Sequence, residues 1–85
     1  MDRRTLTDFL TAEFGGCTVS GLEALPGGDR MAGTLLWAGF EGLSQIDRQN
    51  RLWDALREHF DAAELQSISF LITFTPDEVE AITSD

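Results

Sequence analysis

A strand that follows a long helix determines the topology this chain can adopt. Residues 67–75, S-I-S-F-L-I-T-F-T, give the clearest strand pattern, because two sets of side chains alternate along them. The two sets are Ile68, Phe70, Ile72 and Phe74, and Ser69, Leu71, Thr73 and Thr75. A helix is predicted over residues 45–60, after two strands over residues 17–24 and 31–38 that are joined by the turn L-P-G-G-D-R. A hairpin, a helix and a further strand require a crossover, and a crossover makes one pair of strands parallel.

Two shorter helices complete the pattern. The first is predicted over residues 5–14, with Thr5 as its N-cap and Gly15-Gly16 as its stop. The second begins at T-P-D-E, where Thr75 is the cap and Glu78 is the third helical residue. The order α-β-β-α-β-α predicts an α+β fold in a single domain, residues 1–85. In this fold a three-stranded mixed sheet carries its helices on one face.

The long helix combines a clear start with an apolar stripe. Ser44 is the predicted N-cap, because its hydroxyl can accept from a backbone N–H in the first turn. The residues predicted to face the core are Ile46, Trp53, Leu56 and Phe60, widened by Leu52. Trp37 also fits the apolar pattern, and both tryptophans are predicted to be core residues rather than binding anchors.

The charge of the chain argues against nucleic acid as a partner. The 85 residues include 15 acidic and 6 basic side chains, for a net charge of −9. Such a surface repels phosphate backbones and anionic membranes. Over residues 40–60, three arginines stand against four acidic residues, so the charge of this segment is −1. The arginines are Arg48, Arg51 and Arg57, and the acidic residues are Glu41, Asp47, Asp54 and Glu58.

Composition also limits metal and membrane binding. One cysteine, Cys17, and one histidine, His59, cannot supply the four soft ligands of a zinc or iron site. No apolar run approaches the roughly 20 residues that span a bilayer. The N-terminal residues M-D-R-R-T-L-T-D-F-L lack the apolar stretch of a signal peptide. We therefore expect a cytoplasmic protein that binds no metal by itself.

The motif that leads into the long helix resembles the BolA family. Members share a Phe-x-Gly-x-Ser approach, found here as Phe40, Gly42 and Ser44, followed by an Arg-His pair and later by a strand that ends in Thr-x-x-Glu. Arg48 stands at the arginine position, and Gln49 stands at the histidine position. The resemblance follows the order of elements over residues 5–82, although the motif itself is confined to residues 40–56.

The resemblance implies a fold related to the type II KH domain and a role in iron–sulfur cluster trafficking with a monothiol glutaredoxin. In the family, the histidine of the Arg-His pair ligates the shared cluster, and a Cys or His in the hairpin loop can assist. Gln49 is a poor ligand for iron, and the loop L-P-G-G-D-R has neither Cys nor His. The family's metal-binding role therefore does not carry over to this chain, whereas its partner-binding surface can.

Two hypotheses follow from these observations. The first is a non-enzymatic, BolA-like protein-interaction module, a monomer or weak dimer, whose partner is a monothiol glutaredoxin in iron–sulfur homeostasis. Its predicted partner-binding residues are Phe40, Gly42, Ser44, Arg48, Gln49 and Arg51. The run Arg48-Gln49-Asn50-Arg51 can equally be a solvated helix face. The alternative is a KH-like transcriptional regulator that binds nucleic acid, and an enzyme is disfavoured because no catalytic constellation is evident.

Overall fold

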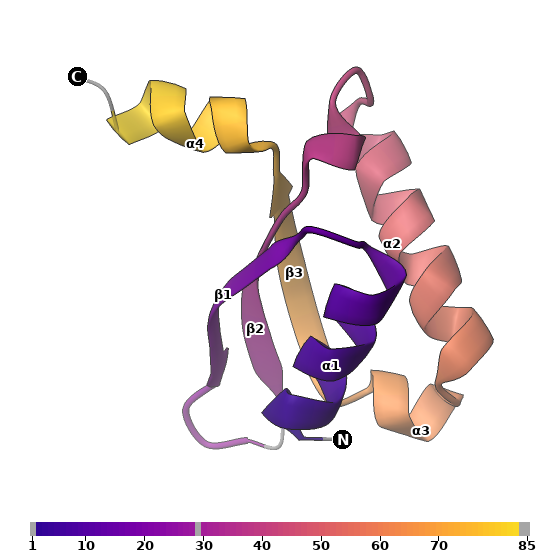
Figure 1. Cartoon of the computed structure of the whole chain (residues 1–85). Coiled ribbons are helices and arrows are strands. Elements are labelled where there is room, and N and C mark those ends of the chain that lie inside the picture. Colours follow the sequence, from indigo (N-terminus) through magenta and orange to yellow (C-terminus); the bar gives the residue numbers. More distant parts are fainter. Residues whose placement is uncertain (1, 29, 84–85) are drawn as a thin grey trace.

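The order of elements in the computed structural model follows the sequence pattern (Figure 1). The structure describes residues 2–28 and 30–83. Its elements are α1 (Arg3–Glu13), β1 (Thr18–Ala24), β2 (Met31–Leu36), the 3-10 helix η1 (Ala38–Phe40), α2 (Gln45–His59), α3 (Ala62–Leu65), β3 (Ile68–Phe74) and α4 (Pro76–Thr83). The short helices η1 and α3 were not predicted, because three or four residues are too few to show a helical period.

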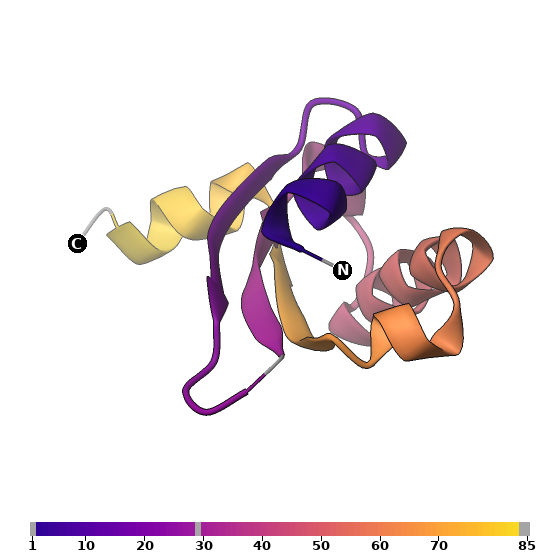
Figure 2. The ribbon, with the colours of Figure 1, turned by 90° about the horizontal axis from the view of Figure 1, so that it is seen from below.

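The sheet is mixed, as the crossover requires. β2 lies in the centre, antiparallel to β1 and parallel to β3. Figure 2 shows α1, α2 and α3 on one side of the sheet, while α4 leaves the end of β3 toward the other side. The predicted α+β class with a three-stranded mixed sheet is confirmed. No helix in the described part of the chain has the length and apolar content to cross a membrane.

Side-chain caps fix where the helices begin. Ser44 caps α2 as predicted, with its hydroxyl accepting from the backbone N–H of Asp47 at 3.1 Å. The predicted cap of α1 was wrong. Asp2 accepts from the N–H of Thr5 at 2.8 Å, so the helix begins at Arg3 and Thr5 lies inside it. A carboxylate at this position also gains from the helix dipole.

An irregularity in β3 changes which of its side chains face the core. Met31 pairs with Ile68, but the next residue of β2, Ala32, pairs with Phe70, so β3 carries one extra residue. Beyond it, Leu71 and Thr73 face the helices and are buried, whereas Phe70 and Ile72 point outward. Beyond Ile68, the more apolar of the two alternating sets therefore points away from the helices.

One hydrophobic core fills the space between the sheet and its helices. Leu52 and Leu56 supply the buried stripe of α2, and the two tryptophans pack at the margin of the core. Ile46 was wrongly placed in this stripe, because it lies six positions before Leu52, about 120° around the helix, and is 74% exposed. The buried core comprises Leu6, Leu10, Phe14, Met31, Leu35, Phe40, Leu52, Leu56, Phe60, Ile68 and Leu71.

Candidate interaction site at the start of the long helix

The loop that leads into α2 is fixed at both ends. Phe40 is fully buried in the core, and its ring lies 5.1 Å from that of Trp37. Gly42 is exposed with φ at +83°, a left-handed conformation that other residues rarely adopt. Ser44 then caps the helix. Within the Phe-x-Gly-x-Ser motif, Phe40 therefore anchors the loop in the core and Gly42 makes its turn. Ser44 ends the loop at the start of α2.

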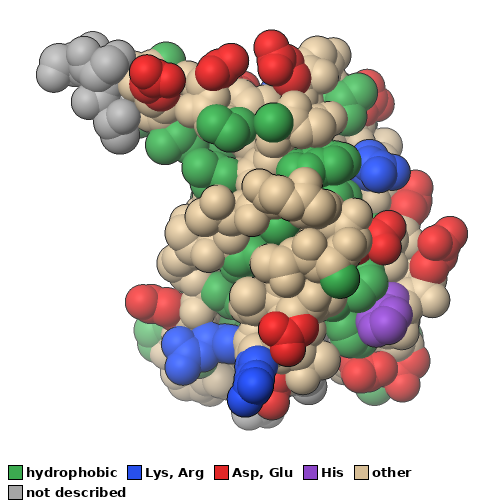
Figure 3. Space-filling model, viewed as in Figure 1, with side chains coloured by type: hydrophobic (Ala, Val, Ile, Leu, Met, Phe, Trp, Pro, Cys, Tyr) green, Lys and Arg blue, Asp and Glu red, His purple; other side chains and the backbone are tan. Residues whose placement is uncertain are grey.

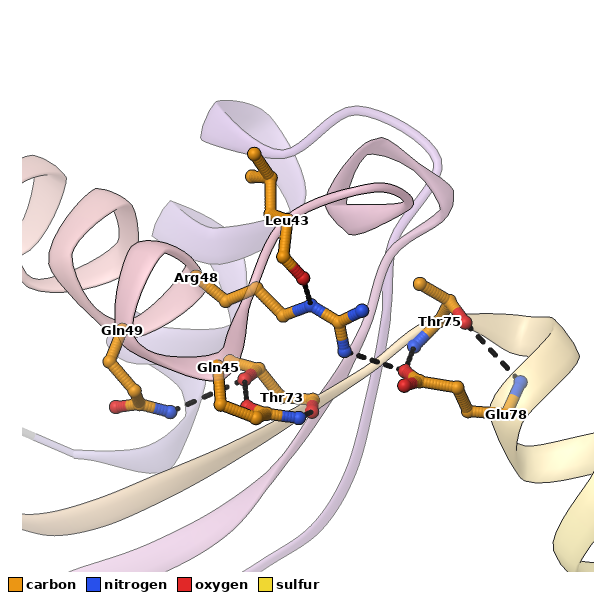
Figure 4. A network of polar contacts seen from close by, with 7 residues as sticks. All are labelled: Leu43, Gln45, Arg48, Gln49, Thr73, Thr75 and Glu78. Atoms are coloured by element: carbon orange, nitrogen blue, oxygen red, sulfur yellow. Dashed lines mark hydrogen bonds and ion pairs between the residues drawn. The ribbon is translucent and has the colours of Figure 1, made fainter.

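Arg48 joins this loop to the last helix (Figure 4). Its Nε donates to the carbonyl oxygen of Leu43 at 2.9 Å, and its terminal nitrogen donates to Glu78 Oε1 at 2.6 Å. The same Oε1 accepts from the N–H of Thr75 at 2.7 Å, and the Thr75 hydroxyl accepts from the N–H of Glu78. The predicted Thr75–Glu78 cap is thus confirmed. The solvated-face interpretation is wrong for Arg48, which is only 6% exposed.

The ion pair changes the protonation of Glu78. The hydrogen bond from Arg48, followed by that from the Thr75 backbone, lowers the pKa of the Glu78 carboxyl below its ordinary value of 4.5. A carboxyl with a lowered pKa in the folded state stabilises the protein above its unfolded-state pKa. That contribution is lost as the pH falls through the folded-state pKa.

We expect acid to release α4 from α2. The carboxyl of Glu78, followed by carbon-detected NMR, should titrate below pH 4.5 in the native chain. In Arg48→Met its midpoint should move up toward that value, because the strongest hydrogen bond to the carboxylate is lost. Arg57→Met, which removes an exposed ion pair of α2, is the control variant and should leave the midpoint of Glu78 unchanged. An unchanged midpoint for Glu78 in the variant would show that the ion pair does not form in solution.

Two glutamines of α2 bond to the outer edge of β3. Gln49 Nε2 donates to the carbonyl oxygen of Leu71 at 2.8 Å and to Thr73 Oγ1 at 3.3 Å. Gln49 Oε1 accepts from Trp53 Nε1 at 3.1 Å. Gln45 Nε2 donates to the carbonyl oxygen of Thr73 at 3.0 Å, and the Thr73 hydroxyl donates back to Gln45 Oε1 at 2.7 Å. Both amide groups thus bridge α2 to carbonyls that an edge strand otherwise leaves unpaired.

Comparison with known proteins identifies the fold. No model of a protein family matches the sequence, and no curated protein matches it. A solved structure of a bolA protein homologue from Coxiella burnetii superposes with a TM-score of 0.66, at 22% sequence identity. The superposition covers 94% of this chain and 97% of that chain. This chain has a BolA-like fold. The resemblance noted in the sequence thus extends to the arrangement of nearly all its elements.

The residues present at the BolA-like ligand position do not fit an iron–sulfur cluster. Both polar atoms of the Gln49 amide are used in hydrogen bonds within the protein. In the described residues, no three His, Cys, Asp or Glu side chains are grouped so as to hold a metal ion. His59 is at the far end of α2, where its ring stacks on Phe9 with the centroids 4.6 Å apart. Cys17 donates to the Leu10 carbonyl, and burial raises the pKa of its thiol.

An exposed arginine lies on a small aromatic platform beside the BolA-like motif. The Arg51 guanidinium carbon is 5.4 Å from the ring centroid of Trp37 and 5.7 Å from that of Phe14. The indole itself is held by a 3.0 Å hydrogen bond from Trp37 Nε1 to the carbonyl oxygen of Gly15. Such stacking fixes the direction of a guanidinium that remains at the surface.

Gly39 makes room for this platform, which gives a testable expectation. A Cβ at position 39 would lie 2.5 Å from Trp37 Cζ2, so the indole has to move. We expect Gly39→Ala to lower the free energy of unfolding by about 1–2 kcal/mol and to shift the tryptophan fluorescence. Gly15→Ala is the matched control, since its Cβ would meet nothing within 4 Å. Equal stability of the two variants would contradict the packing described.

The structure separates the predicted partner-binding residues into three groups. Phe40 and Arg48 are buried and hold the loop in place, while Gly42, Ser44 and Arg51 are exposed. Gln49 is half-buried in the bonds to β3. Sequence reasoning missed Gln45 and the exposed Ile46. The four-residue spacing of Gln45 and Gln49 places them on one helix face and was the available signal for a shared role.

Proposed function

We propose that this chain is a non-enzymatic protein-interaction module, and that it docks through the 40–44 loop and the first turns of α2. The observation that carries the proposal is the side chain of Ile46, which is 74% exposed directly after this rigid loop. An isolated apolar side chain on a surface is ordinary. Here it adjoins a loop that a buried residue, a positive-φ glycine and a buried arginine hold in one conformation.

The exposed face of α2 offers a mixed contact surface. Four exposed residues lie on the same side of the helix: Ile46, Asp47, Asn50 and Arg51. An apolar side chain, two groups of opposite charge and an amide suit a protein partner better than a small ligand. Three other residues affect this surface indirectly, because they position the loop and the helix: Phe40, Arg48 and Gln49.

The partner we propose is a monothiol glutaredoxin. Support comes from the resemblance to the BolA family and from the BolA-like fold. Because both polar atoms of Gln49 are occupied, this chain contributes a docking surface and no cluster ligand from that position. Two of the three arginines of α2 give the nucleic-acid alternative no support. Arg48 is buried against Glu78, and Arg57 pairs with Asp54 at 2.8 Å.

Ile46→Asp tests the docking surface. We expect this variant to weaken binding of a purified monothiol glutaredoxin at least about tenfold by calorimetry, because the buried apolar contact becomes a charge. Ile82→Asp is the matched control, since Ile82 is also exposed, at 64%, but lies on α4. It should bind normally. Equal affinities of both variants would overturn the assigned surface, and a native chain that does not bind would overturn the assigned partner.

A further inference from the structure

A hollow lies between the β1–β2 hairpin and the segment that joins α3 to β3. Its volume is about 570 Å³, within the range of roughly 300–1,000 Å³ that is usual for small-molecule sites. Figure 1 shows the hairpin and α3 at the end of the sheet where β3 begins, whereas the loop that leads into α2 lies at the opposite end. This hollow is therefore separate from the surface around Ile46.

Backbone hydrogen bonds hold the walls of the hollow together. The N–H of Leu25 donates to the carbonyl oxygen of Arg30 at 2.8 Å, which closes the hairpin. The next N–H along the chain, that of Met31, donates to the carbonyl oxygen of Ser67 at 2.8 Å. The N–H of Ser67 in turn donates to the carbonyl oxygen of Glu64 on α3 at 3.1 Å. The fold itself thus brings the residues around Arg30 and Ser67 together.

The irregularity in β3 adds a side chain to the hollow. The extra residue of this strand, between Ile68 and Phe70, is Ser69. It alternates in sequence with Leu71, which is buried under the helices, yet Ser69 is exposed and lines the hollow. An extra residue of this kind redirects a side chain and is frequent next to functional sites.

The polar side chains of the hollow have no partners within the protein. Those among its described lining residues are Arg30, Gln66, Ser67 and Ser69. None of these four side chains is hydrogen-bonded or ion-paired to another residue of the described chain. Arg48 and Arg57, by contrast, each pair with a carboxylate. No acidic residue belongs to the described lining, so the charge that Arg30 brings to it is not offset there.

The chemistry of these groups favours an anionic ligand with several oxygens. The guanidinium of Arg30 offers a planar set of N–H donors that matches phosphate and carboxylate groups. The Gln66 amide and the two serine hydroxyls can donate from other positions on the wall. A tetrahedral phosphate presents acceptor oxygens in several directions, whereas both oxygens of a carboxylate lie in one plane. A phosphate group therefore uses this spread of donors more fully.

The charge of the whole chain limits how many phosphates can approach. A nucleic-acid strand would place a row of phosphates against a protein of net charge −9. Figure 3 shows acidic side chains along α4 and beside α2, and basic ones at the lower end of the molecule, where α1 begins. A single phosphate in the hollow avoids most of that repulsion. The described lining also includes Leu25, Pro26 and Ala63, which can contact the organic part of a small molecule.

We propose that this hollow binds the phosphate group of a small phosphate monoester. The guanidinium of Arg30 contacts the phosphate, and the side chains of Gln66, Ser67 and Ser69 donate to its remaining oxygens. The ligand replaces water on side chains that are exposed or half-buried in the free protein. This site goes beyond the proposed docking function, and it requires neither the partner protein nor the start of α2.

Phenyl phosphate provides the probe. It is titrated at neutral pH and low salt into the ¹⁵N-labelled protein alone. We expect saturable amide shifts at Gly28, Arg30, Ser67 and Ser69. Phenol, which lacks the phosphate, should cause none of them. Inorganic phosphate should bind at least about threefold more weakly, because it lacks the organic part. Equal binding of inorganic phosphate would overturn the assignment to an ester, and shifts centred elsewhere, or no binding of phenyl phosphate, would overturn the site.

Variants of exposed residues separate a local contact from a general charge effect. Arg30→Gln should weaken binding of phenyl phosphate about tenfold or more. Arg57→Gln is the matched control, because it removes the same charge from an exposed arginine of α2 and should leave the affinity unchanged. Ser69→Ala should weaken binding with no change of charge. Equal losses in the two arginine variants, or an unchanged affinity in both Arg30→Gln and Ser69→Ala, would contradict the proposal.

Discussion

Replacing Gln49 with leucine is expected to lower the free energy of unfolding by about 2–4 kcal/mol. The substitution keeps the size of the side chain but removes both of its polar atoms. The carbonyl oxygen of Leu71 then loses its donor and the indole N–H of Trp53 loses its acceptor. Groups left unpaired in a half-buried place are costly, because water reaches them poorly. Urea unfolding measures the loss.

The neighbouring residue supplies the control for this substitution. Asn50 is exposed, so Asn50→Leu should change the stability by no more than about 0.5 kcal/mol. Gln49→Leu should also raise the rate of hydrogen exchange along β3, because α2 no longer holds its edge. If Gln49→Leu is as stable as Asn50→Leu, Gln49 is not a structural residue and its side chain is free for another role.

Replacing Arg48 with methionine should lower the stability by about 2–4 kcal/mol, since charged hydrogen bonds contribute more than neutral ones. The variant loses the bonds to Leu43 and Glu78 at once. The side chain of Glu78 is 42% exposed and remains hydrated, which limits the loss. Hydrogen exchange should show α4 opening more readily than the core.

An exposed arginine of the same helix serves as the comparison. Arg57 pairs with Asp54 while its side chain is 58% exposed. Arg57→Met should therefore cost only about 0–1 kcal/mol. Arg48→Met and Glu78→Gln should also be non-additive when combined, because each removes the same contact. Additive losses would mean that the two residues act on stability separately.

Local patterns predicted the order of elements, and that order predicted the mixed sheet. The face of β3 was not predictable, because the extra residue between Ile68 and Phe70 depends on pairing with β2. The alternation in the sequence is regular through this point. Ile46 was misplaced for a similar reason. It is apolar, but the first turn of α2 lies off the buried stripe that Leu52 and Leu56 define.

The candidate site was predictable in its position but not in its internal contacts. The Phe40-Gly42-Ser44-Arg48 spacing located the loop and the helix. The bonds of Arg48 to Glu78 and of Gln49 to Leu71 join residues 30 and 22 positions apart. Contacts between residues this far apart along the chain produce no periodic pattern in the sequence. A charged residue in a helix is ordinarily exposed, so the burial of Arg48 was not predictable from the sequence.

The account depends on Gln49 serving the fold rather than a metal. Cluster assembly from a monothiol glutaredoxin, iron and sulfide, with and without this chain, tests it most directly by electron paramagnetic resonance. We predict a complex in which this chain adds no nitrogen ligand to the cluster. A spectrum of the reduced cluster that changes when the native chain is added, and that changes back in Gln49→Ala or in His59→Ala, would contradict the account.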